Sequence, residues 1–157
     1  MTRGPITVGV ISDTHGMLRP EAIDTLRDSE LIIHAGDVGD PDVLERLRAV
    51  APTIAVRGNI DTGRWARSLP LSEVVEVGDL RLYVIHDLSE LDLDPKAAEL
   101  AGVISGHSHR PNAELREGVL FLNPGSAGPR RFTLPVGVAK LRVVGTRLSH
   151  ELIELKV

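Results

Sequence analysis

This sequence contains two pairs of potential metal ligands, and in each pair a single residue separates the two ligands. His107 and His109 are separated by a serine in GVISGHSHRPN, and Asp13 and His15 are separated by a threonine. In extended backbone, residues i and i+2 point to the same side, with roots roughly 6.6 Å apart. That separation suits the ligands of two adjacent metal ions, which lie about 3.5–4 Å apart in binuclear hydrolases. The spacing therefore predicts chemistry carried out on a pair of cations.

Three more polar residues follow apolar runs in the same way, namely Asp37, Asn59 and His86. Glycines directly precede three of the candidates, where a bare backbone allows sharp turns and close approach (Gly36, Gly58 and Gly106). The whole set holds oxygen and nitrogen donors without sulfur, a mixture that suits first-row divalent metals rather than calcium. We expect two divalent transition metal ions per chain, with Mn2+ favoured over Ni2+, Co2+, Fe2+ or Zn2+.

The elements that must position these residues alternate in the first sixty residues. Apolar, β-rich runs predict strands at 6–12, 31–37 and 52–59, and helical spacing predicts helices at 19–29 and 40–50. Asp40 is the expected N-cap of the second helix and Pro41 its first residue. The order βαβαβ predicts a parallel sheet with right-handed crossovers.

The second half of the chain is predicted to form hairpins. The segments 73–86 and 113–123 contain the turns Gly78-Asp79 and Glu117-Gly118, and 135–157 is expected to form a last strand pair. We predict a single α/β domain over residues 1–157, with two mixed sheets flanked by helices. Every candidate ligand follows a predicted strand, at the edge where α/β sheets bind their ligands. The candidates are therefore expected to meet in one site.

The composition excludes several classes of protein. The chain has 157 residues, 42% of them hydrophobic, a net charge of -4 and no cysteine. Disulfides, thiolate metal sites and a cysteine nucleophile are excluded. Mild acidity argues against nucleic acid as the main partner. No apolar run is long enough for a membrane span, and the first apolar run is too brief for a signal peptide. A cytoplasmic protein with no membrane partner is expected.

The order D-x-H, GD, GN, H, GHxH resembles the calcineurin-like metallophosphoesterase superfamily over nearly the whole chain. The compact length, GDVGD and NPGS are most similar to its small prokaryotic phosphodiesterase branch. The resemblance implies a four-layer α/β/β/α sandwich. It also implies two ligand sets that share a bridging Asp37. One ion would be held by Asp13, His15, Asp37 and His109, and the other by Asp37, Asn59, His86 and His107.

The resemblance further implies a binuclear metal-dependent phosphoesterase that uses a metal-bridging hydroxide as nucleophile. Asp37 and Asn59 would be the catalytic residues, and the Asn59 amide and Arg110 would contact the phosphate ester. Many relatives carry a histidine where this chain has Ile60, and that histidine can protonate the leaving oxygen. Its absence favours activated phosphodiesters as substrates. Asp61, the next residue, is expected to orient an imidazole placed at position 60.

Two alternatives remain at this point. One is a catalytically idle binding or scaffold protein on the same fold, and the other is a phosphomonoesterase or nucleotide phosphatase of the same superfamily. A homo-oligomer is possible. His34 lies within a predicted strand and is expected to be packed rather than to bind metal, while Trp65 is expected either to cover the pocket or to anchor its loop. Arg57, Arg64, Arg130 and Arg131 are further candidates for steering an anion.

Overall fold

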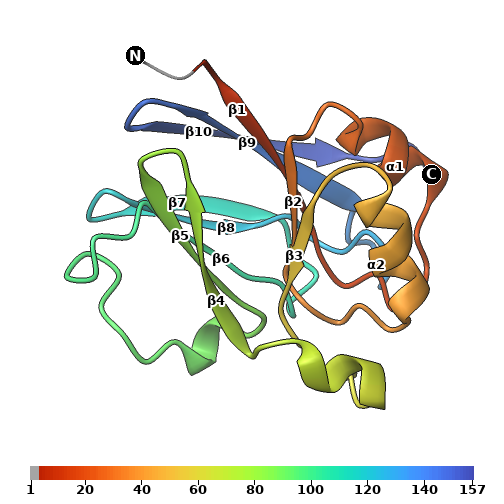
Figure 1. Ribbon diagram of the computed structural model, residues 1–157. Coiled ribbons are helices and arrows are strands. Elements are labelled where there is room, and N and C mark those ends of the chain that lie inside the picture. The colour runs from red at the N-terminus through yellow and green to blue at the C-terminus, as the bar shows by residue number, and fades with distance from the viewer. Residues whose placement is uncertain (1–3) are drawn as a thin grey trace.

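The first of two mixed sheets contains the first and last strands of the computed structural model, which describes residues 4–157 (Figure 1). Its strand order is β10-β9-β1-β2-β3. The central strands β1 (Ile6–Ile11), β2 (Leu31–His34) and β3 (Thr53–Ala55) run parallel, as the βαβαβ pattern predicts. The hairpin of β9 (Gly137–Val144) and β10 (Arg147–Glu154) extends the sheet antiparallel to β1.

The second sheet has the order β4-β5-β6-β8-β7. Hairpins join β4 (Ser72–Val77) to β5 (Leu80–Ile85) and β7 (Asn112–Arg116) to β8 (Val119–Asn123), so both predicted turns are confirmed. The short strand β6 (Gly102–Ile104) lies between the hairpins and runs parallel to β5 and β8.

Two α-helices cover the outer face of the first sheet (Figure 1). Helix α1 is Pro20–Leu26 and helix α2 is Pro41–Arg48, and the Asp40 carboxylate caps α2 by accepting the N–H of Asp42. Leu26 and Leu47 are fully buried in one apolar cluster with Ile32 of β2. None of the helices within residues 4–157 has the length and apolar character that crossing a membrane requires.

Aliphatic side chains fill the space between the two sheets. Val8 and Val10 of β1 pack in one cluster with Leu82 and Val84 of β5, and none of the four is exposed. Full burial of such a side chain stabilises the fold by about 1.5–3 kcal/mol. This dry layer fixes the two sheets to each other and therefore fixes the strand ends from which the candidate site projects.

The two-sheet α/β sandwich is confirmed, but its layer over the second sheet contains no α-helix within the described residues. A loop at 86–101, with a short 3₁₀ turn (η2, Leu88–Glu90), covers Tyr83, Val103 and Phe121 instead. Asp87 accepts the N–H of Ser89, and Asp94 accepts the N–H groups of Lys96 and Ala97. These two caps, with Pro95 at the start of the second turn, hold the segment in separate turns.

Candidate metal centre

Five of the seven candidate ligands come together at the carboxyl ends of the strands. Donor atoms of Asp13, His15 and His109 lie within 4.8 Å of one another, and so do donor atoms of Asp13, Asp37 and His86. Asp13 follows β1, Asp37 follows β2, His86 follows β5 and His109 follows β6. The first sheet thus supplies the carboxylates and one histidine, and the second sheet supplies the other two histidines.

The Asp13 carboxylate is fully buried and uses its two oxygens differently. Its Oδ2 accepts the hydroxyl of Ser12 at 2.6 Å and the backbone N–H of His107 at 3.1 Å. Its Oδ1 lies 3.3 Å from His109 Nε2 and has no hydrogen-bond partner among residues 4–157. A buried carboxylate oxygen without a partner is costly, so this oxygen is suited to a cation.

The Asp37 carboxylate repeats this division of roles. Its Oδ1 accepts the backbone N–H of Ile60 at 3.1 Å, while its Oδ2 lies 3.5 Å from His15 Nε2 and 3.3 Å from His86 Nε2. Burial on its own would raise the pKa of Asp37. The hydrogen bonds from His86 and Ile60 outweigh burial and lower the pKa to about 2. Asp37 is therefore an anion whose Oδ2 lies between histidines of both sheets.

The histidines respond to these carboxylates. The neighbouring Asp13 carboxylate raises the pKa of His15. Burial lowers the pKa of His86, but the hydrogen bond with Asp37 and the charge of Asp13 reverse the shift, so the pKa is raised. Burial lowers the pKa of His109. His86 Nδ1 lies 2.8 Å from the carbonyl of Ala35, to which it donates, and this bond turns Nε2 toward the carboxylates.

Asn59 and His107 border this cluster instead of joining it. Asn59 follows β3, and its Oδ1 lies 3.1 Å from His86 Nε2. The His107 side chain is 47% exposed, and its Nε2 faces Asp87 Oδ2 at 3.7 Å. The rings of His107 and His86 are 5.2 Å apart between centroids. Both residues therefore stand on the His86 side of the cluster, at its solvent edge.

The backbone of the ligand loops differs from the expected extended form. Five candidates have φ in the left-handed region, between 49° and 71° (Asp13, His15, Asp37, His107 and His109). Such conformations cost about 1–3 kcal/mol each outside glycine and concentrate at functional sites. The i, i+2 argument for neighbouring side chains is therefore wrong here. Instead, the His109 ring lies 5.3 Å from that of His15 and the His107 ring faces His86, so the two histidines diverge.

Two of the predicted glycines allow the sheets to approach at the site. A Cβ on Gly36 would lie 2.6 Å from His86 Nδ1, and a Cβ on Gly106 would lie 2.5 Å from Asp13 Oδ2. Gly36 also has φ of +102°, a conformation that other residues rarely adopt. Each glycine thus makes room for a ligand carried by the opposite sheet.

Asp61 braces two ligand loops, a role that sequence reasoning missed. The side chain is only 4% exposed, and its carboxylate accepts the backbone N–H groups of Val38, Gly39 and Gly58 at 3.1, 2.9 and 2.9 Å. It thereby ties the loop of Asp37 to the loop of Asn59. Because both oxygens are engaged inside while Ile60 is 39% exposed, the expectation that Asp61 orients an imidazole at position 60 is wrong.

His34 is a buried brace between two other loops, in agreement with its expected packing. Its Nδ1 accepts the N–H of Gly36 at 3.1 Å, so its proton is on Nε2, which donates to Thr14 Oγ1 at 3.0 Å. Thr14 in turn donates to the carbonyl of Val38. Burial lowers the pKa of His34 to about 4, so the imidazole is neutral at pH 7.

Short hydroxyl residues near the ligands complete this support; sequence reasoning placed Ser126 in a turn near the site but did not single out Ser12 and Thr14. Ser126 Oγ donates to the carbonyl of Asp13 at 3.0 Å, and Ser12 and Thr14 flank Asp13 in the sequence. Their position next to a candidate ligand was the available signal, since small hydroxyl side chains readily bond to nearby backbone and carboxylate groups.

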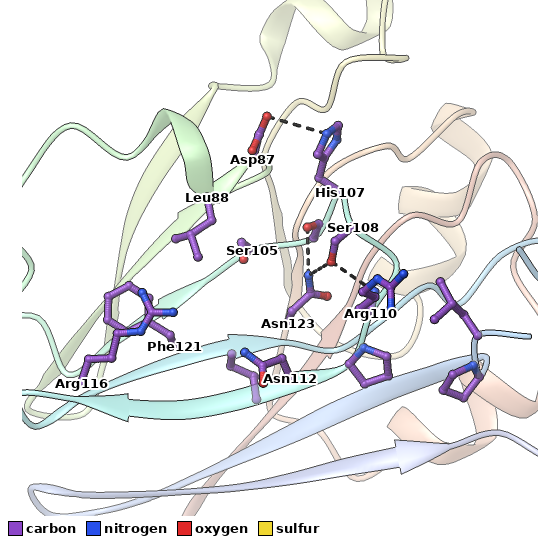
Figure 2. Close-up of a pocket in the computed structure, with 15 residues that line it drawn as sticks. Asp87, Leu88, Ser105, His107, Ser108, Arg110, Asn112, Arg116, Phe121 and Asn123 are labelled. Carbon is purple, nitrogen blue, oxygen red and sulfur yellow. Dashed lines mark hydrogen bonds and ion pairs between the residues drawn. The ribbon is translucent and has the colours of Figure 1, made fainter.

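The remaining sequence candidates lie around the centre. Arg110 is exposed and lines a cavity of about 680 Å³ that begins at His107 (Figure 2). Arg130 and Arg131 line a hollow of about 130 Å³ beside His15 and His109. Trp65 packs against the apolar cluster under the helices, which makes it an anchor of its loop.

The sequence matches a family model described as the calcineurin-like phosphoesterase superfamily domain over residues 6–145. It is 40% identical over 161 residues to a probable metallophosphoesterase of Methanothermobacter thermautotrophicus, covering 93% of this chain and 91% of that protein. It is 31% identical over 136 residues to the phosphodiesterase MJ0936 of Methanocaldococcus jannaschii, covering 75% of this chain and 82% of that protein.

A solved structure with the same fold is that of vacuolar protein sorting 29 from Cryptosporidium parvum. It aligns with a TM-score of 0.83 at 19% identity and covers 98% of this chain and 93% of that chain, a likeness that concerns the fold alone. The matched family model spans most of the chain, and small archaeal metallophosphoesterases are among the relatives, as the motif order predicted. The chain therefore belongs to the calcineurin-like phosphoesterase superfamily, which supports a hydrolase of phosphate esters.

Proposed function

We propose that this chain is a binuclear metal-dependent phosphodiesterase acting on small phosphate esters, with residues 1–157 as one domain. The observation that carries the proposal is the shared design of Asp13 and Asp37. Each carboxylate has one oxygen held by backbone N–H groups or a hydroxyl and one oxygen turned toward histidines. The buried Asp13 Oδ1 and His15 Nε2 have no hydrogen-bond partner within the described chain, which fits cation ligands.

We assign Asp37 as the ligand shared by both ions. Its Oδ2 is 3.5 Å from His15 Nε2 and 3.3 Å from His86 Nε2, whereas Asp13 Oδ1 is 3.8 and 4.0 Å from the same two atoms. Asp37 is thus the better placed carboxylate between the two sides. One ion would have the ligands Asp13, His15, Asp37 and His109, and the other would have Asp37, Asn59, His86 and His107.

Divalent ions held there would supply a water of lowered pKa and positive charge against the phosphoryl oxygens. The chain supplies the remaining contacts. Because Asn59 Oδ1 faces His86, its amide N–H groups can donate to a phosphoryl oxygen. Arg110, which lines the large cavity, can approach the same phosphate. Hydrolysis adds water to phosphorus and breaks one ester P–O bond, which releases an alcohol or phenol and a phosphomonoester.

The surroundings of Ile60 favour leaving groups that need no proton. Ile60 has no donor on its side chain, and two other titratable residues, Asp87 and His34, are unsuited to act as the acid. The hydrogen bond from Ser89 lowers the pKa of Asp87, which keeps it ionised, and His34 is wholly buried and neutral. Aryl phosphodiesters, whose leaving oxygens are stable as anions, are therefore the proposed substrates.

Hydrolysis of bis(p-nitrophenyl) phosphate and p-nitrophenyl phosphate by the purified protein tests this function. Exhaustive chelation should abolish release of nitrophenolate, and Mn2+, Ni2+ or Co2+ should restore it better than Mg2+, because four imidazoles suit those ions. The diester should be the better substrate. Full activity after chelation and metal-free dialysis would contradict the binuclear mechanism, and preference for the monoester would contradict the phosphodiesterase assignment.

A further inference from the structure

The cavity of about 680 Å³ beside the metal centre is larger than phosphoryl binding needs (Figure 2). It begins at His107 and Asp87, whose side chains face each other at 3.7 Å, and extends past Ser105 and Leu88 to Phe121 and Arg116. Pockets of roughly 300–1,000 Å³ hold organic ligands. The volume therefore suits an organic group attached to the phosphate.

The far end of the cavity offers a flat surface. The guanidinium of Arg116 lies 4.7 Å from the centroid of the Phe121 ring, and its Nη2 donates to Glu114 Oε2 at 3.0 Å. The contact with the ring and the hydrogen bond to the carboxylate hold the guanidinium in place. A planar guanidinium stacks well on aromatic groups, so this wall favours a flat, aromatic ligand over a short alkyl chain.

The charges around the centre distinguish the two ester arms of a diester. The large cavity is lined by the Asp87 carboxylate, which would repel a departing oxyanion, as well as by Arg110 and Arg116. Arg130 and Arg131 line the small hollow beside His15 and His109, which has no carboxylate among its lining residues, so a departing oxyanion would be attracted there. The large cavity is thus suited to the arm that stays on phosphorus.

We propose that the cavity between His107 and Arg116 binds the retained arm of a phosphodiester, and that this arm is a planar aromatic group such as an aryl ring or a nucleobase. The proposal rests on the phosphodiesterase function and deepens it. A monoester has no retained arm, so the cavity selects diesters independently of Ile60.

Three diesters with the same leaving group test the proposal. Methyl p-nitrophenyl phosphate, bis(p-nitrophenyl) phosphate and the p-nitrophenyl ester of thymidine 5′-phosphate all release nitrophenolate and differ in the retained arm. The two aromatic diesters should exceed the methyl diester in kcat/KM by about 10-fold or more. Whichever of the two is faster identifies the source of the aromatic arm, a simple aryl ring or a nucleoside.

Variants of Arg116 localise the effect. Arg116→Ala should reduce the aromatic-to-methyl ratio by about 5- to 20-fold and leave the methyl diester within about twofold. Arg116→Lys keeps the charge without the flat guanidinium, so it should also reduce the aromatic-to-methyl ratio. Arg147→Ala, which removes an exposed arginine of β10 that does not line this cavity, is the matched control and should change nothing.

Two different failures can be told apart. Absence of metal-dependent nitrophenolate release from all three diesters would overturn the proposed function. Hydrolysis of all three with equal kcat/KM, or an Arg116→Ala variant that slows all three equally, would overturn the aromatic cavity and leave the phosphodiesterase intact. An Arg116→Lys variant that keeps the full ratio would also overturn stacking as the basis of recognition.

Discussion

Replacement of Asp61 by asparagine should destabilise the metal-free protein although Asp61 is not a proposed ligand. Asp61 Oδ2 accepts from Val38 and Gly58, and Oδ1 accepts from Gly39. An asparagine oxygen at the Oδ2 position keeps two of these bonds, but as neutral bonds about 1 kcal/mol weaker each. Its NH2 group then faces the Gly39 N–H, which loses its partner at a cost of about 1–3 kcal/mol.

The sum is a decrease of about 3–5 kcal/mol in the free energy of unfolding for Asp61→Asn. Urea unfolding of the chelated protein, followed by circular dichroism, measures this quantity. Asp79→Asn is the matched control, because Asp79 is exposed in the β4–β5 turn, and it should change stability by no more than about 0.5 kcal/mol.

A second measurement separates bracing from stability alone. Asp61 ties the loop of Asp37 to the loop of Asn59, so Asp61→Asn should weaken Mn2+ binding in calorimetry by about 10- to 100-fold at a temperature where the variant is folded. Equal unfolding free energies for Asp61→Asn and Asp79→Asn would refute the brace. Unchanged Mn2+ affinity would refute its link to the metal centre.

Three further predictions concern the ligands and their surroundings. Asp37→Ala should lower the metal content at both sites, whereas His109→Ala and His107→Ala should each weaken one ion; two ions still bound per chain in Asp37→Ala, by metal analysis, would contradict the bridge. Ile60→His should raise kcat/KM for alkyl monoesters relative to aryl diesters. A general acid typically contributes about 10²–10⁴-fold, and we expect an increase near the lower value because Asp61 is not available to orient the new imidazole. An unchanged ratio would contradict the account of position 60. The pKa of His34 falls from 6.5 to about 4 on folding, so the unfolded chain binds a proton at a higher pH than the folded chain does. The free energy of unfolding should therefore drop by about 3 kcal/mol as the pH falls from 6.5 to 4. Urea unfolding of the metal-free protein at pH 7 and pH 4.5 should show most of that drop, about 2 kcal/mol, and His34→Gln should lack this part of it. An equal pH dependence in both proteins would contradict the buried neutral imidazole.

The strands, helix starts and meeting place of the site could be predicted because their signals are local. Asp40 followed by Pro41 marks the start of α2 in residue type alone. Asp13, Asp37 and His86 each follow an apolar run, and the ends of parallel strands meet at one edge of a sheet. Chain order and hydrophobic pattern were sufficient for this much.

Other features depend on contacts between distant segments and leave no local signal. The left-handed φ of His107 and His109 is held by the loop around them, including the bond from the His107 N–H to Asp13, which is 94 residues away. Asp61 faces inward because three N–H groups from two loops are gathered there. Neither property follows from the identity of the residue, so the i, i+2 spacing pointed to neighbouring ligand loops but assumed an incorrect backbone geometry.

The central claim is the pair of cations, and anomalous diffraction from crystals grown with Mn2+ tests it most directly. The account predicts two manganese peaks about 3.5–4 Å apart. One should lie among Asp13, His15 and His109, the other beside His86, and an Asp37 oxygen should contact both. A single peak, or two peaks that do not share Asp37, would contradict the account.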